Sequence, residues 1–134
     1  MASIFSRIVT GEIPSYTVAE SNDFFAFLDI NPLAKGHTLV IPKKEVDYIF
    51  DLDDALYKEL FVFAKGVGKA IESVVSCKRM GIIVFGLDVP HAHIHLIPIN
   101  KPSDMNFESP KLSLEEEEFR ELAAKIEKAY REDV

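Results

Sequence analysis

The most constraining feature of this sequence is the stretch His91-Ala92-His93-Ile94-His95-Leu96-Ile97-Pro98, which holds three of the four histidines of the chain. Strict alternation of this kind predicts a β-strand, because side chains two residues apart point to the same face of a strand. One face therefore carries three imidazoles, and the other carries Ala92, Ile94 and Leu96, which require a core. Imidazole titrates near neutral pH and can attack, donate or accept a proton. The pattern indicates a functional site built on a strand.

The rest of the chain predicts an α+β fold around this strand. A short helix is expected from Ser3 to about Thr10, and a long amphipathic helix from Asp51 or Asp53 to about Ser76. Further strands are expected at residues 16–20, 24–29, 37–42 and 81–86. Mostly consecutive strands, without a regular βαβ alternation, predict an antiparallel sheet of about five strands that is covered by helices.

Two apolar segments of the sequence are predicted to be buried by other parts of the structure. Residues 81–86 form a strand that is too apolar to be exposed on either face. In the long helix, Phe61, Val62 and Val75 widen the apolar surface beyond one stripe, so a second face is expected to be covered, for example by a partner subunit.

Length and composition indicate one domain. The chain has 134 residues, of which 48% are hydrophobic and 28% charged, which is ordinary for a soluble globular protein. The expected domain spans residues 1–134, with a core at 3–100 and a C-terminal extension whose helix covers 111–131. Ser113, with Glu116 three residues later, has the spacing of a capping box for this helix.

Charge and cysteine content exclude several classes of protein. The net charge of −7 argues against a general binder of nucleic acid or of membrane surfaces, which would need a basic face. The single Cys77 rules out an internal disulfide and a multi-cysteine structural zinc site. No apolar run approaches the roughly 20 residues that a membrane helix needs, and no signal peptide is evident. A cytoplasmic protein is therefore expected.

The histidines alone allow three interpretations. Surface histidines without a role are disfavoured, since three lie in register on a strand that faces a core. A metal site would need one adjacent pair plus His37, because His91 and His95 lie about 13 Å apart along a strand, whereas zinc holds its nitrogens within about 2.1 Å. In the third interpretation, the central imidazole attacks an extended phosphate-containing substrate, and a neighbouring imidazole interacts with the leaving group.

The histidine row resembles the histidine triad, His-φ-His-φ-His-φ-φ, of the HIT family of nucleotide hydrolases and transferases. Residues 4–5 with 11–14 resemble the opening of that family, and residues 29–32 and 36–44 resemble its central stretch. The resemblance spans about residues 3–98 and is closest to the Hint-like branch and its small bacterial relatives. It implies a HIT-like fold, with a long central helix and a C-terminal helix, and a homodimer that joins two sheets into one.

The resemblance also implies residue roles. His93 would attack the α-phosphate of a purine nucleotide and form a nucleotidyl-histidine intermediate, which water then hydrolyses. His95 would lie on the leaving-group side, and His91 and His37 would form a supporting hydrogen-bond network. Asp29 would hold the ribose hydroxyls. The apolar pocket around the purine would be formed by Ile4, Phe5, Ile8, Phe27, Ile30 and Leu39.

The implied activity is metal-independent, needs no cofactor, and cleaves a nucleoside monophosphate from a phosphoramidate or phosphoanhydride. Two alternatives are a nucleotide-binding protein of the same fold with little or no turnover, and a metal-dependent hydrolase that uses His37, His91 and His93. The chain departs from the family pattern just before the triad, where Met80, Leu87 and Asp88 replace an Asn, a Gln and a hydroxyl residue. An anionic Asp88 beside a phosphate is unfavourable, so we expect substrate preference and rate to differ from those of relatives.

Overall fold

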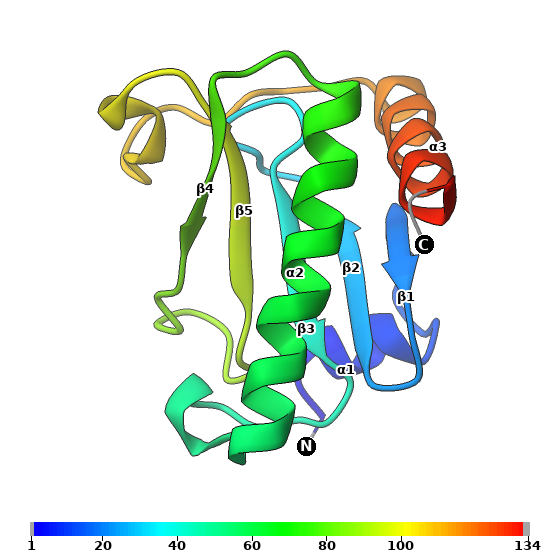
Figure 1. Ribbon diagram of the computed structural model, residues 1–134, viewed down its shortest axis with the longest axis vertical. Coiled ribbons are helices and arrows are strands. Elements are labelled where there is room, and N and C mark those ends of the chain that lie inside the picture. Colours follow the sequence, from blue (N-terminus) through cyan, green and yellow to red (C-terminus); the bar gives the residue numbers. More distant parts are fainter. Residues whose placement is uncertain (1, 133–134) are drawn as a thin grey trace.

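The computed structural model describes residues 2–132, and its five strands form one antiparallel sheet (Figure 1). Met1 and residues 133–134, the ends of the expected domain, lie outside the described residues. The α+β class, the five antiparallel strands, the long central helix and the C-terminal helix are as the sequence predicts. The elements in chain order are α1 (Ile4–Val9), β1 (Thr17–Glu20), β2 (Phe24–Leu28), β3 (Thr38–Pro42), α2 (Asp54–Val74), β4 (Arg79–Ile83), β5 (Ile94–Ile99) and α3 (Glu116–Glu132). Two short 3-10 helices span Ile49–Asp51 and Pro102–Met105.

The order of the strands in the sheet is β1-β2-β3-β5-β4, so β4 and β1 form its edges. The register aligns Phe27 of β2, Leu39 of β3 and His95 of β5 across three neighbouring strands. Because direct cross-strand partners share a face, this row runs over one face of the sheet. Ala26, Val40 and Ile94 form the next row, which lies on the opposite face.

The two faces of the sheet are covered differently. Helices α2 and α3 pack on the face of Ala26 and Ile94 and build the larger core with them. In Figure 1, α2 crosses the middle of the sheet and α3 stands beside β1. The opposite face carries only the short α1, around a smaller cluster that includes Phe5 and Leu39. The histidines lie on this face as well, where Phe5 of α1 packs against His93 and Phe107 of the C-terminal extension packs against His95.

The histidine strand is shorter than the alternation predicts. Strand β5 begins at Ile94, which pairs with Val40 of β3. The two remaining residues of β3, Ile41 and Pro42, have no partner in β5. Before it, the Ala92 amide donates to the carbonyl of Val46 at 2.7 Å, in the segment that follows β3. His91 and His93 are nevertheless buried, because this turn of the chain folds over the end of the sheet.

The expectation that the strand near residues 81–86 is covered on both faces is wrong. Strand β4 lies at the edge of the sheet, and Ile82 on its helical face is 53% exposed. Figure 1 shows the cause, since α2 passes over the central strands and leaves β4 uncovered at the side.

The three residues that widen the apolar surface of α2 do not share one second face. Phe61 is half-buried beside Val84 and Phe85, next to β4. Val62 is 69% exposed beside the turn between β1 and β2. Val75, just beyond the end of the helix, is half-buried near Leu122 of α3. Only the Phe61 side therefore continues the apolar surface of the sheet edge.

Helix α3 begins at Glu116, five residues after its expected start, and Ser113 does not cap it. Residues 111–115 instead run along the surface, where the Leu112 amide donates to the carbonyl of Pro32 at 2.8 Å. The carboxylate of Glu118 accepts from the Glu115 amide at the start of the helix. The cap formed by Glu118 and Glu115 thus takes the place of the predicted cap at Ser113. Negatively charged side chains in the first turn of α3 favour a helix that begins here.

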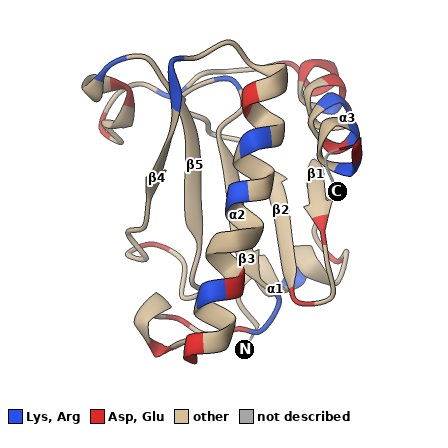
Figure 2. Ribbon diagram, viewed as in Figure 1, with Lys and Arg blue, Asp and Glu red and all other residues tan. Residues whose placement is uncertain are grey.

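Charged side chains avoid the central strands of the sheet and occur only at the ends of its edge strands, as Glu20 of β1 and Arg79 of β4. Figure 2 shows the central strands without Lys, Arg, Asp or Glu, whereas α2 and α3 carry both signs of charge. None of the helices described between residues 2 and 132 is long and apolar enough to cross a bilayer.

Gly36 provides a test of the packing behind the histidines. Its φ is +100°, and an added Cβ would lie 3.0 Å from Val75 Cγ2 and 3.2 Å from Pro98 Cγ. We expect Gly36→Ala to lower the free energy of unfolding by about 2–5 kcal/mol. Left-handed backbone strain contributes about 1–2 kcal/mol and overpacking about 1–3 kcal/mol. Gly11→Ala is the control, because Gly11 has φ +83° but no atom within 4 Å of its added Cβ. Urea titration compares the two, and equal losses would contradict the packing argument.

Candidate active site

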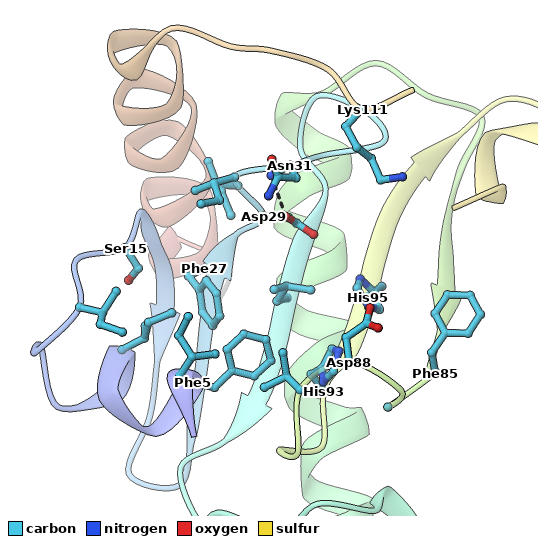
Figure 3. Close-up of a pocket in the computed structure, with 18 of the residues that line it drawn as sticks. Phe5, Ser15, Phe27, Asp29, Asn31, Phe85, Asp88, His93, His95 and Lys111 are labelled. Atoms are coloured by element: carbon cyan, nitrogen blue, oxygen red, sulfur yellow. Dashed lines mark hydrogen bonds between the residues drawn. The ribbon is translucent and has the colours of Figure 1, made fainter. Parts of the chain in front are cut away.

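A cavity of about 420 Å³ opens on the face of the sheet that carries α1 (Figure 3). Its walls come from α1, from β2 and β3, from the loop that precedes the histidines and from the C-terminal extension. The structure places in it every residue expected to bind the nucleotide, together with two of the histidines: Ile4, Phe5, Ile8, Phe27, Asp29, Ile30, Leu39, Asp88, His93 and His95. The shared face of Phe27, Leu39 and His95 forms its floor.

His93 offers a lone pair to the cavity. Its Nδ1 lies 2.7 Å from the carbonyl oxygen of His91, which can only accept, so Nδ1 carries the ring proton. In residues 2–132 every fully buried side-chain nitrogen or oxygen has a hydrogen-bond partner, and His93 Nε2 has none, so this atom must reach the cavity. Burial lowers the pKa of His93, which keeps the ring neutral and the Nε2 lone pair free.

His95 offers a proton, because of a relay that begins at a backbone amide. The Leu33 amide donates to His37 Nδ1 at 3.0 Å, so the proton of the neutral His37 is on Nε2. His37 Nε2 in turn donates to His95 Nδ1 at 3.0 Å, which places the proton of His95 on Nε2. Burial lowers the pKa of His37 to about 4 and that of His95 to about 3, so both rings are neutral.

The two free ring nitrogens differ in what they offer. The ring centroids of His93 and His95 are 5.0 Å apart, and both side chains line the cavity (Figure 3). One Nε2 carries a lone pair and the other carries a hydrogen. A nucleophile and a hydrogen-bond donor thus lie side by side.

His91 has both ring nitrogens engaged away from the cavity. Its Nε2 donates to the carbonyl of Pro42 at 2.7 Å, and its Nδ1 accepts from Ser3 Oγ at 2.8 Å. Ser3 also caps α1, as the sequence predicts, and its amide donates to the carboxylate of Glu45 at 2.6 Å. This network fixes α1, which carries Phe5, against the turn that positions His93. No sequence signal links Ser3, Glu45 and His91, which are far apart in the chain.

Asp29 lies at the rim, where its carboxylate accepts from the Asn31 amide at 2.8 Å. Its other oxygen is 3.5 Å from His37 Nε2. Because burial keeps His37 neutral, this contact is not an ion pair near pH 7. Burial also raises the pKa of Asp29.

The histidines expected in the metal-dependent alternative do not come together. His91 uses both nitrogens elsewhere, and the cluster that does form consists of Asp29, His37 and His95, whose ligand atoms lie within 4.8 Å of one another. A metal-binding histidine usually donates through its second nitrogen. His37 instead accepts from the Leu33 amide there, which holds a proton on the nitrogen that would face the metal. The donor set therefore fits a metal poorly.

Several residues of the cavity wall were not predicted from the sequence, among them Phe85, Phe107 and Lys111. Phe107 lies with its ring centroid 4.8 Å from that of His95 and 4.6 Å from that of Phe85. Lys111 donates to the carbonyls of Phe107 and Ser109. Phe107 is an isolated aromatic residue in the mostly polar segment 101–110, and this is the one signal in the sequence that sets it apart.

The three departures from the family pattern differ in position. Met80 packs against the core on the helical face and does not line the cavity. Leu87 and Asp88 do line it, and Leu87 is 85% exposed. In the described part of the chain, the Asp88 carboxylate forms neither a hydrogen bond nor an ion pair, and Figure 3 shows it at the histidines.

Comparisons with known proteins agree with this geometry. The model of the HIT domain family matches residues 10–101. An uncharacterized HIT-like protein of Borreliella burgdorferi is 38% identical over 92% of this chain and 94% of its own. The adenosine 5′-monophosphoramidase hnt1 of Schizosaccharomyces pombe is 36% identical over 94% of this chain and 96% of its own. The crystal structure of a hypothetical histidine triad nucleotide-binding protein from Sulfolobus tokodaii superposes with a TM-score of 0.81, at 29% identity over 96% of this chain and 91% of that one.

The neutral buried histidines predict acid sensitivity. His37 and His95 have folded-state pKa values of about 4 and about 3, against 6.5 for ordinary histidine. Between these limits the unfolded chain binds more protons, so the free energy of unfolding should fall as the pH is lowered from 7 to 4. His95→Gln removes one such group. It should reduce the dependence of the free energy of unfolding on pH by up to about 1.4 kcal/mol per pH unit. Urea titrations at several pH values test this, and a wild-type stability that stays flat would contradict neutral histidines.

Proposed function

The chain belongs to the HIT domain family, and from this we propose that it is a hydrolase that releases a nucleoside monophosphate from a phosphoramidate or phosphoanhydride. The observation that carries the proposal is the pairing of a free lone pair on His93 Nε2 with a proton on His95 Nε2 at one cavity. Relatives named as an adenosine 5′-monophosphoramidase and as a nucleotide-binding protein support it.

The cavity suits a purine nucleotide in one orientation. Its apolar end, which includes Phe5, Phe27 and Leu39, accepts a base by burial of its faces. Asp29 at the rim accepts hydrogen bonds from the ribose hydroxyls. This orientation places the phosphate at His93 and His95.

The reaction then follows from the two ring nitrogens. The lone pair of His93 Nε2 attacks phosphorus, and the bond to the leaving atom breaks with its electron pair going to that atom. The hydrogen on His95 Nε2 stabilises this developing pair, and a leaving nitrogen takes up its protons from water. A water molecule then attacks phosphorus, the pair of the phosphorus–nitrogen bond returns to His93, and the water proton passes to solvent. The carbonyl of His91 and the ring of His37 act as positioning groups.

Removal of the nucleophile tests this function. We expect His93→Ala to reduce hydrolysis of adenosine 5′-phosphoramidate by about 10³-fold or more, measured with a chelator present. Wild-type turnover should resist the chelator, since no step uses a metal. Calorimetry with AMP is the control, because the variant should still bind nucleotide if only the nucleophile is lost. Turnover that the chelator abolishes, or that survives in His93→Ala, would refute the mechanism.

A second candidate is a nucleotide-binding protein with little turnover. The observation that favours it is the loop at Leu87 and Asp88, which presents an apolar and an anionic side chain where the family has polar groups that contact the phosphates. Loss of one such donor typically reduces rate by about 10²–10³-fold. AMP binding without turnover of any leaving group would select this candidate.

We further propose a homodimer that pairs the β4 edges of two sheets. The edge presents unpaired backbone groups with the exposed Ile82, and the apolar surface continues through Phe61 to Phe50, which is 68% exposed. Pairing of two copies along this edge would cover Ile82, Phe61 and Phe50. The wide apolar surface expected of α2 supports this only on its Phe61 side.

A charge placed on this edge tests the dimer. Ile82→Lys should convert a dimer to a monomer in sedimentation equilibrium, because two lysines would then meet across the paired edges. Val62→Lys is the matched control, since Val62 is also an exposed aliphatic residue but lies beside the β1–β2 turn. A dimer that survives the first substitution, or dissociates with the second, would exclude this interface.

A further inference from the structure

We propose that Asp88 is a specificity-determining residue that selects substrates by the charge of the leaving group, favouring an amine over a phosphate or carboxylate. The inference rests on the proposed function and deepens it. It starts from the one carboxylate of the cavity that nothing in the described chain engages: Asp88 is exposed, lines the cavity and has no hydrogen-bond or ion-pair partner there.

The order of strands assigns the two ends of the cavity. Phe27 and Leu39 lie on the β2 side of His95, whereas Phe85 and Asp88 come from the loop after β4, on its other side. With the base at the apolar end and phosphorus at the histidines, the remaining space for a leaving group is the end formed by this loop and by Phe107. Figure 3 shows Phe85 and Asp88 at this end, apart from Phe5 and Phe27.

Asp88 is the charge at this end whose field acts on His93. The Lys111 ammonium also lines the cavity, where it donates to the carbonyls of Phe107 and Ser109, but its field acts on Asp29 and His37, whose protonated forms it disfavours. The field of Asp88 reaches His93, whose protonated form it favours. A phosphorus atom held by His93 therefore has a free carboxylate nearby on the leaving-group side.

The sign of this charge discriminates between the two bonds that the family can break. In cleavage of a phosphorus–nitrogen bond the nitrogen gains a proton before the bond is fully broken, so it carries positive charge in the transition state. The bond pair then goes to nitrogen, which leaves as a neutral amine. Cleavage of an anhydride sends the pair to an oxygen that leaves with negative charge. A carboxylate stabilises the first transition state and repels the second.

Two substrates with the same nucleotide test the proposal by turnover. Adenosine 5′-phosphoramidate loses ammonia and ADP loses phosphate, and kcat/KM is measured for both. Asp88→Asn, which keeps the shape and removes the charge, should lower the first and raise the second by about 10-fold each. Glu72→Gln removes the same charge from the outer face of α2. It should change neither the kcat/KM values of the two substrates nor their ratio. A ratio that Asp88→Asn leaves unchanged would overturn the proposal.

A binding series separates this proposal from the proposed function. The ligands are the 2-aminoethyl ester of AMP, its methyl ester and ADP, which place a positive, a neutral and a negative group in the leaving position. Calorimetry with His93→Ala prevents turnover. The aminoethyl ester should bind more tightly than ADP, and adding Asp88→Asn should reduce that preference about 10-fold. If Asp88→Asn leaves the preference for the aminoethyl ester over ADP unchanged, the proposed role of Asp88 is refuted and the proposed hydrolase activity is not. If binding shows this preference but the wild-type protein has no turnover, only the hydrolase activity is refuted.

Discussion

One hydrogen bond, from the Leu33 amide to His37 Nδ1, determines which nitrogens of His37 and His95 carry their protons. A backbone amide can only donate, so it fixes the tautomer of His37, and His37 then fixes that of His95. If the acceptor and donor ends of His37 were exchanged, His95 would present a lone pair beside that of His93 and no hydrogen. The chemistry of two side chains thus depends on the conformation of one turn between β2 and β3.

Burial makes this arrangement independent of pH around neutrality. All four histidines have lowered pKa values, and the largest cause for each is burial, which removes the hydration of the charged ring. The same desolvation that keeps the rings neutral makes each hydrogen bond between them stronger than it would be in water. The histidines are therefore an ordered network of neutral donors and acceptors.

Much of the fold follows from the sequence, because its signals are local. Alternation located the strands, Ser3 and Asp53 cap the helices as their side chains predict, and the row of histidines identified the face that carries the cavity. Errors arose where a partner distant in sequence decides the outcome. The apolarity of β4 indicated burial, but its place at the sheet edge, set by the strand order, leaves Ile82 exposed. Likewise, Phe107 enters the cavity only because the extension folds back over the histidines, which no local pattern reveals.

The tether from the Leu112 amide to the Pro32 carbonyl joins the extension to the turn after Asp29. As a result, the cavity is lined by two separate parts of the chain, residues 4–39 and residues 85–111. In the orientation proposed above, the first part would hold the base and the second would face the leaving group. The two parts could then vary independently, because one loop and one tail supply the second without contributing to the first.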